Sequence, residues 1–496
     1  MEWLLDRFEG DDDVAYAEVG ALSQTKTDLV LTENGPRDEL SFDETGVWCR
    51  VFADGAADYR YTTSLDEETL ADVADRAVRG GEFLAQDDSA RYDRLTTHQA
   101  VHDGWASGRI DDVALETKRS TLESGLAAVA DAVERCWINY DDAHIDSTAA
   151  TTTGSTVRTT LDRANVTVTL SVRDGPTVRR HAGSTRGAVF LEELADVFAD
   201  AAADVRTLAN AETAAAPTGE TTVALTPRAA GQLFAFAARY LEADTHYMGL
   251  SPYDVGDEFG PDSLSVADTV HAGSWAARAY DAELRPTTPV QLIEGGTVTR
   301  LLHNTASAAE DDAFPAGHAV HSLGFDQPPR IHARHLDVAP GDANRATLRA
   351  GADVLVERFD DPWLRDEFER VQRSGVMPAS ALYAKDIDRK TEDRTACGQA
   401  TFPIAEGYRL RDGERDGRVA GVSLAYGPET LRSITAIGAV RGTLTGVDEK
   451  HKSRVPYAVT APGVRLRATL QKNETFVSRP RASIPSQCPH SRWDRS

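Results

Sequence analysis

The feature that most constrains the fold of this chain is a short segment near its middle, residues 210–219 (NAETAAAPTG), which has the composition of a linker. Its residues are small or polar, and Pro217 and Gly219 interrupt regular structure. At 496 residues the chain is long enough for more than one domain. We therefore predict an N-terminal domain over residues 1–215, a C-terminal domain over residues 216–470 and a disordered tail over residues 471–496.

The first of these domains is expected to be an antiparallel sheet with helices. Over residues 13–63, runs of β-branched and aromatic residues are separated by turn-forming residues, which predicts a meander of short strands. A helix follows, for which Ser64 is a suitable N-cap and Gly80-Gly81 a stop. The other expected features are turns at Asn34-Gly35, Glu44-Thr45-Gly46 and Asp54-Gly55, helices over residues 122–136 and 190–208, and strands between residues 137 and 172.

The second domain is expected to be largely β. A strand is predicted over residues 221–225, and a helix begins at the Thr226 cap with Pro227 in its first position. Residues 288–302 have the pattern of a hairpin with Gly295-Gly296 in the turn. The fold class predicted for the whole chain is therefore α+β, with an N-terminal antiparallel sheet and helices followed by a mostly β domain.

The charge of the chain is strongly negative. Lys and Arg number 53 against 79 Asp and Glu, a formal net charge of −26, and only 7 of the 53 are Lys. Such a surface repels phosphate backbones, which argues against binding to nucleic acid. It also suits a protein that stays dissolved at very high salt, where charges are screened within about 3 Å at 1 M. We predict a halophilic, salt-adapted cytoplasmic protein.

Secretion, membrane insertion and disulfide stabilisation are not expected. No apolar run approaches the roughly 18 residues of a membrane-spanning helix, and the first residues are acidic rather than basic. The four cysteines, at positions 49, 136, 397 and 488, are widely spaced and form no CxxC pair. These observations predict an intracellular protein.

Four histidines form the densest group of possible metal ligands. His318, His321, His332 and His335 make two HxxH pairs within 18 residues. Imidazole is a good ligand for zinc or copper. The first pair lies in a Gly-flanked loop and the second in a strand-like segment, where side chains three apart point to opposite faces. The preferred expectation is that the chain holds no metal, and a site built from these four histidines is kept as an alternative.

The common catalytic motifs are absent. The sequence contains no GxGxxG, no GxxxxGK[ST], no GxSxG, and no His followed directly by Glu. A zinc helix of the HExxH type is therefore excluded.

Three segments carry a recognisable pattern along the chain. The first comprises YAEV (16–19), LTENG (31–35) and GVWCRVFADG (46–55); the second comprises YDAE (280–283) and TPVQLIEGGTV (288–298); the third is GVSLAYGPETLRSITAIG (421–438). In their order and spacing, which extend over about residues 10–470, these segments together resemble the TldD/PmbA family, whose members form a zinc metallopeptidase assembly.

The resemblance implies where a zinc site would lie in this family. TldD-type members carry HExxxH on the helix after the linker and a cysteine near the C-terminus, so that two imidazoles and a thiolate hold zinc while the glutamate acts as general base. In this sequence those positions fall at or beside Ala235, Phe236, Tyr240 and Thr445. None of these side chains can replace the family's ligands, so no catalytic residue is expected in this chain.

The segment after that helix, DTHYMGLSP (244–252), is similar to the PmbA/TldE branch, which lacks zinc ligands. The resemblance implies a subunit that pairs with a zinc-bearing TldD-like protein, with zinc only in that partner, around an unfolded peptide substrate. Two other hypotheses stay open: a non-catalytic peptide-binding or regulatory homodimer, and an independent metalloenzyme that uses the four histidines.

Overall fold

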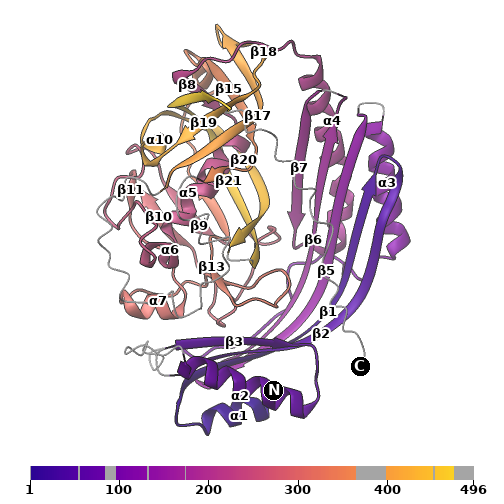
Figure 1. Cartoon of the computed structure of the whole chain (residues 1–496), viewed down its shortest axis with the longest axis vertical. Coiled ribbons are helices and arrows are strands. Elements are labelled where there is room, and N and C mark those ends of the chain that lie inside the picture. Colours follow the sequence, from indigo (N-terminus) through magenta and orange to yellow (C-terminus); the bar gives the residue numbers. More distant parts are fainter. Residues whose placement is uncertain are drawn as a thin grey trace.

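The computed structural model describes residues 2–53, 56–83, 96–130, 133–173, 175–364, 398–450 and 453–473. Two sheets carry the fold (Figure 1). The first consists of strands from the N-terminal half, and its long strands form a curved layer. The second consists of strands from the C-terminal half and lies on the inner side of that curve. The predicted α+β class is confirmed.

The first sheet is antiparallel except for one short strand. Its order is β3-β2-β1-β5-β6-β4, and β4 runs parallel to residues 156–159 of β6. β7 pairs with a later stretch of the same strand, residues 164–171. Alternating burial along its strands leaves one face for helices and the other for the C-terminal half. The strands are β1 (Val14–Thr32), β2 (Gly35–Ala53), β3 (Ala56–Thr62), β4 (Gln99–His102), β5 (Arg135–Thr151), β6 (Thr156–Ser171) and β7 (Thr177–Ser184).

Helices cover the outer side of this sheet (Figure 1). The predicted helix over residues 190–208 is confirmed as α4 (Phe190–Asn210), which buries an apolar stripe that includes Leu194, Phe198 and Val205. α3 (Leu115–Val129) packs beside it. At the other end of the sheet, α1 (Glu2–Glu9) and α2 (Glu67–Phe83) contribute to a separate core with β1 and β2.

The meander of short strands was wrong. β1 and β2 are each 19 residues long, and Gly46, predicted in a turn, lies inside β2 opposite Leu22. The reason for glycine there is space, since a Cβ on Gly46 would come within 2.4 Å of the Tyr61 hydroxyl on β3. The expected turn at Asn34-Gly35 is confirmed, and Gly35 has a φ of 100°.

Two predicted helix boundaries were also wrong. α2 continues through Gly80, and Asp66 rather than Ser64 supplies the cap, because its Oδ1 accepts a hydrogen bond from the Thr69 amide at 2.8 Å. The helix expected over residues 122–136 begins at Leu115 and ends at Val129, so that Cys136 lies in β5. β-Branched and aromatic residues after position 135 favour the strand.

The second sheet mixes parallel and antiparallel pairs. β8 lies beside both β15 (parallel) and β21 (antiparallel), and β14 runs parallel to β21. The hairpin predicted over residues 288–302 is confirmed by β10 and β11. The strands are β8 (Gly219–Leu225), β9 (Val266–Thr269), β10 (Val290–Glu294), β11 (Thr297–Val298), β14 (His335–Val338), β15 (Val354–Phe359), β16 (Trp363–Leu364), β17 (Ala400–Arg411), β18 (Glu414–Arg418), β19 (Val422–Tyr426), β20 (Ile434–Lys450) and β21 (Ser453–Lys472).

A few short elements surround this second sheet. The strands β12 (Ala319–Val320) and β13 (Arg330–Ile331) pair with each other. The helices of the C-terminal half are α5 (Pro227–Ala238), α6 (Ala243–Tyr247), α7 (Thr305–Glu310), α8 (Arg345–Arg349) and α10 (Pro428–Arg432).

Buried ion pairs join the two halves. Arg50 of β2 donates to Glu18 at 2.8 Å and to Glu283 of the C-terminal half at 2.6 Å. Arg180 of β7 donates to both oxygens of Glu406, at 2.8 and 2.7 Å. Removing one partner of such a pair leaves an uncompensated buried charge, which makes these contacts strong determinants of how the halves are placed.

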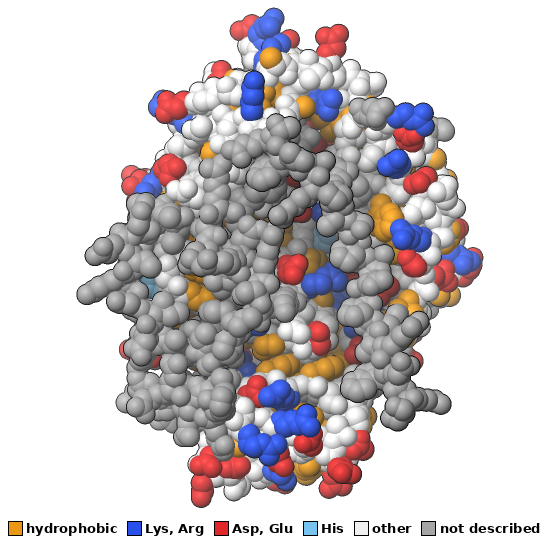
Figure 2. Space-filling view, viewed as in Figure 1, with side chains coloured by type: hydrophobic (Ala, Val, Ile, Leu, Met, Phe, Trp, Pro, Cys, Tyr) orange, Lys and Arg blue, Asp and Glu red, His pale blue; other side chains and the backbone are white. Residues whose placement is uncertain are grey.

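Several predictions lie partly or wholly outside these residues. The thiols at positions 397 and 488 and the tail beyond residue 473 are not among the described residues, whereas Cys49 and Cys136 are buried free thiols. The domain limits at residues 215 and 216 stay a prediction, and they fall between α4 and β8. Within the described part of the chain, no helix is long and apolar enough to cross a membrane. On the face drawn in Figure 2, acidic and basic side chains are interspersed over the described surface.

Candidate functional site

The helix to which the family resemblance assigns the zinc motif is α5. It begins as predicted, with the Thr226 hydroxyl accepting a hydrogen bond from the Ala229 amide and Pro227 in the first turn. Small and apolar residues on most of its surface allow it to lie deep in the second half, against β21, β20 and β15. Leu233, Phe236 and most of its other apolar side chains are buried.

One side of α5 borders a cavity of about 510 Å³ at the junction of the two halves. Arg179 comes from β7 of the first sheet, and the remaining wall comes from the C-terminal half. Both apolar and charged side chains face this space. The lining residues are Arg179, Gln232, Ala235, Phe236, Arg239, His332, Ala333, Leu336, Asp360, Asp361, Pro362, Phe402, Val447, Asp448, Glu449, Tyr457 and Ala458.

The charged centre of the cavity wall is Asp448. Its carboxylate pairs with the Arg239 guanidinium and accepts a hydrogen bond from His332 Nε2 at 3.1 Å. Burial alone would raise the pKa of Asp448, but Arg239 and His332 outweigh it and hold the pKa well below its usual range. Burial would lower the pKa of His332, but Glu242 and Asp448 outweigh it and raise the pKa. The ring also bonds to the Ala333 carbonyl through Nδ1 at 2.6 Å, so both ring nitrogens donate, as in an imidazolium.

A buried lysine lies behind this wall. Lys450 Nζ donates to Glu242 at 2.5 Å, to Asp244 at 2.7 Å and to the Ile331 carbonyl at 2.7 Å. Burial opposes its charge, but Asp244 and Glu242 outweigh that effect and raise the pKa of Lys450. All three donor positions of the ammonium are used, so Lys450 acts in positioning these carboxylates. Sequence reasoning missed this group, because its members come from α6 and the residue before it, from β13 and from the last residue of β20.

The four positions that the resemblance assigned to the zinc site lie on α5, just after it and on β20. Ala235 and Phe236 line the cavity, whereas Tyr240 is buried in the adjoining core at 1% exposure. Thr445 of β20 accepts or donates a hydrogen bond at 2.8 Å with His181 Nδ1 of β7. These positions supply a methyl group, two aromatic rings and a hydroxyl. Their equivalence to the family's zinc ligands stays a prediction.

The four clustered histidines have separate partners. His318 bonds to Asp268 at 3.0 Å, and His332 bonds to Asp448. His335 lies between the hydroxyls of Ser274 and Thr460, each at 2.8 Å, and His321 packs edge-on against Trp48. Among the described residues, no group of three possible metal ligands includes any of these four imidazoles.

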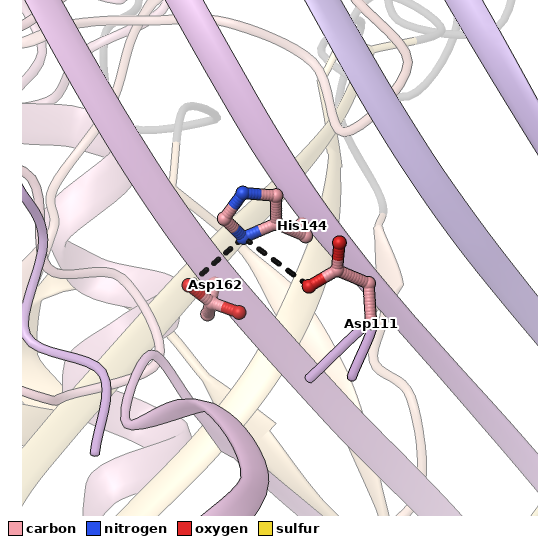
Figure 3. Close-up of side chains that lie close together, drawn as sticks. All are labelled: Asp111, His144 and Asp162. Atoms are coloured by element: carbon pink, nitrogen blue, oxygen red, sulfur yellow. Dashed lines mark hydrogen bonds and ion pairs between the residues drawn. The ribbon is translucent and has the colours of Figure 1, made fainter. Parts of the chain in front are cut away.

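A different histidine has metal-like surroundings. Asp111, His144 and Asp162 offer one nitrogen and two oxygens that all lie within 4.8 Å of one another (Figure 3). His144 on β5 lies directly opposite Asp162 on β6, and Asp111 comes from the loop before α3. The alternating pattern of DDAHID (141–146) was a signal for acidic and imidazole groups on one strand face. Their pairing with Asp111 needed the tertiary fold.

The wall of the cavity beside α5 combines paired charges with an apolar surface. Its buried charges are already paired with each other, and its apolar wall of Ala235, Phe236 and Phe402 suits side chains of a ligand. Around it, β7 and β20 each pair with a named strand on one side, within the described part of the sheets. On the other side, isolated bridges join Ser184 to Ser274 and Gly438 to Ala343, and the Thr445 hydroxyl donates to the His181 carbonyl, so only parts of these edges are open. Such an edge can accept an extended peptide as an added strand.

Comparison with known proteins agrees with this fold. The chain matches the family model described as PmbA/TldA metallopeptidase C-terminal domain over residues 218–470, just over half of its length. It matches the model described as PmbA/TldA metallopeptidase domain 1 over residues 17–80. The second match begins inside β1 and ends within α2.

One sequence relative and two solved structures add to these matches. Metalloprotease slr0863 from Synechocystis sp. is 27% identical over 324 residues, which cover 63% of this chain and only 62% of that protein. The crystal structure of TldE from Thermococcus kodakarensis covers 95% of this chain and 99% of its own, with a TM-score of 0.69 and 12% identity. TM0727 from Thermotoga maritima covers 95% and 100%, with a TM-score of 0.67 and 16% identity. At these identities, likeness to the two structures concerns the fold alone. On the strength of the two family models, the chain belongs to the TldD/PmbA family.

Proposed function

We propose that this chain is a TldE-like subunit of a zinc metallopeptidase assembly and that it binds peptide without cleaving it. The observation that carries the proposal is the cavity wall at α5. Where the resemblance implies the family's zinc helix, this wall presents Ala235 and Phe236, and the carboxylate of its aspartate–histidine pair, Asp448 with His332, is also bonded to Arg239. The resemblance in fold to TldE of T. kodakarensis supports the assignment to that branch.

The proposed substrate is an unfolded peptide held at the junction of the two halves. An extended segment can pair its backbone with the edge of β7 or β20 and place alternate side chains in the cavity. Backbone pairing tolerates many side chains, which suits a peptidase of broad sequence preference. A TldD-like protein, the partner that a TldE subunit implies, would supply zinc and the general base.

We further propose that the protein works in the cytoplasm of a salt-adapted cell. The net charge of −26 supports this, because unscreened repulsion would weaken subunit contacts at low salt. Assays therefore belong in molar salt.

The test is cleavage of a labelled unfolded protein, such as casein, by this chain, by the TldD-like subunit of the same organism, and by their mixture. We expect activity from the mixture, none from this chain, and none when the glutamate of the partner's HExxxH motif is changed to Gln. Cleavage by this chain alone would overturn the proposal. Binding of peptide by a stable homodimer that ignores the partner would instead support the regulatory alternative.

A second variant tests the cavity. Ala235→Trp fills the space beside α5, so we expect the mixture to lose activity while the two subunits still co-elute in size-exclusion chromatography. The matched control is Val101→Trp, since Val101 is 69% exposed on β4. Equal activity of both variants would show that the cavity does not hold the substrate.

A further inference from the structure

We propose that Asp111, His144 and Asp162 bind a divalent transition-metal ion on the outer side of the first sheet. This site is separate from the cavity. On β5, side chains alternate between faces, and His144 shares its face with Asp142, which binds Lys118 of α3 at 3.0 Å. The opposite face carries Ile145, which packs in one cluster with Phe325 of the C-terminal half. The proposal therefore does not depend on the proposed function.

The ligand atoms have the spacing that a bound metal requires. His144 Nδ1 lies 3.1 Å from Asp162 Oδ2 and 3.8 Å from Asp111 Oδ1. Two ligands held at about 2.1 Å from a tetrahedral zinc are about 3.4 Å apart, a value between these two distances. One imidazole and two carboxylates favour a transition metal such as Zn²⁺ over Mg²⁺ or Ca²⁺, which prefer oxygen ligands alone.

The second ring nitrogen is an independent observation that points to the same ligand. His144 is only 4% exposed, yet its Nε2 makes no hydrogen bond. The nearest carboxylate oxygen to Nε2 in an ion pair is Asp146 Oδ2, at 3.4 Å. A metal on Nδ1 requires the ring proton to lie on Nε2, where it would face this carboxylate. A carboxylate behind the ring is the usual support of a histidine that binds metal.

Charge and access also fit a divalent cation. Asp111, Asp146 and Asp162 surround the ring, and Arg109 pairs with this group. Arg109 donates to both oxygens of Asp111, at 3.0 Å to the Oδ1 that faces His144 and at 2.6 Å to Oδ2, so a metal would share Oδ1 with this guanidinium. Three carboxylates and one guanidinium leave two negative charges. Asp162 is fixed by the Ile110 amide at 2.8 Å, whereas the side chain of Asp146 is 58% exposed and opens the site to solvent.

A bound ion would tie the loop before α3 to the sheet. Asp111 belongs to that loop, while His144 and Asp162 belong to the paired strands β5 and β6. The ion would thus add a link between that loop, which the Ile110 amide bonds to Asp162, and two strands that are already paired with each other. Its role would be structural, because the site lies on the face that α3 covers.

The experiment measures metal binding by the purified full-length chain, without peptide or partner, after treatment with a chelator. Co²⁺ is titrated in molar salt and followed by its visible absorption, then displaced with Zn²⁺. We expect about one Co²⁺ per chain. His144→Gln and Asp111→Asn should each bind at least about tenfold more weakly. His246→Gln is the matched control and should bind as the unaltered chain does, because His246, near Asp254 at 3.6 Å, belongs to no comparable group among the described residues.

Two results would overturn the proposal: no stoichiometric Co²⁺ or Zn²⁺ on the unaltered chain, or undiminished binding by both ligand variants. Circular dichroism and the unfolding midpoint without metal check that each variant is folded. Asp111 lies on a loop, so Asp111→Asn decides the question even if His144→Gln does not fold. A plain hydrogen bond between His144 Nδ1 and Asp162, with no metal, is the competing explanation and predicts the first of these results.

Discussion

Two buried histidine–aspartate pairs in this protein differ in how completely they are satisfied. In the cavity wall, His332 uses both ring nitrogens, and its partner Asp448 is shared with Arg239. On the first sheet, His144 faces Asp162 and Asp111 through one nitrogen, while the other has no hydrogen-bond partner. The same two residue types thus form a closed charge network in one place and an open ligand set in the other. The number of remaining donors and acceptors, rather than residue identity, decides which of the two can take a metal.

The largest expected effect on stability comes from removing the carboxylate that His332 and Arg239 share. Asp448→Ala leaves the Arg239 guanidinium and the His332 ring without their shared carboxylate, and these two side chains are only 20% and 5% exposed. Loss of one partner of a buried pair costs about 3–5 kcal/mol. We expect a decrease of that size in the free energy of unfolding, measured with urea in molar salt. A decrease below about 1 kcal/mol would mean that the network is solvated and that the comparison does not hold.

Binding of a metal ion at His144 should have the next largest effect on stability. A ligand that binds only the folded chain stabilises it by about 2.7 kcal/mol at a concentration of 100 times its Kd. We expect Zn²⁺ at such a concentration to raise the unfolding free energy of the unaltered chain and of Asp448→Ala by similar amounts. The His144→Gln variant should show no such gain. An increase in unfolding free energy in all three proteins, including His144→Gln, would show that the metal binds elsewhere.

A smaller effect should appear as a pH dependence of the closed pair. The pKa of His332 in the folded protein lies above its ordinary value of 6.5. The stability that the charged ring contributes is therefore fully present below pH 6.5 and is lost as the pH rises through the folded-state pKa. We expect the difference in unfolding free energy between the unaltered chain and His332→Gln to become smaller as the pH rises. A difference that grows toward high pH would show that the ring is neutral in the folded protein.

The smallest effect is expected from a histidine–aspartate pair that is only partly buried, with side-chain exposures of 17% and 47%. His246 Nδ1 lies 3.6 Å from Asp254, and the aspartate side chain is 47% exposed. Exposed pairs contribute about 0–1 kcal/mol, because water and salt screen them. Asp254→Ala should therefore change the unfolding free energy by less than about 1 kcal/mol under the conditions used for Asp448→Ala. Equal losses in the two variants would remove burial as the reason for the difference.

Local sequence determined much of the fold. The Thr226 cap with Pro227, the Asn34-Gly35 turn and the apolar stripe of α4 each appeared where local rules place them. The family resemblance also came from residues alone, and the family models agree with it. Local rules failed at Gly46. This residue lies within a strand, and glycine is needed there because a Cβ would clash with the Tyr61 ring on the neighbouring strand.

Both histidine sites depended on tertiary structure. The HxxH spacing left a shared site of His318, His321, His332 and His335 only as an alternative, and in the structure each of the four has its own partner. The ligand set of His144 and the network of Asp448 bring together residues from segments 18 to more than 200 positions apart. Sequence alone determined which chemical groups the chain contains, its charge and its turns. The pairing of strands and the packing of the two halves decided which groups meet, because a side chain's surroundings depend on contacts that spacing along the chain does not specify.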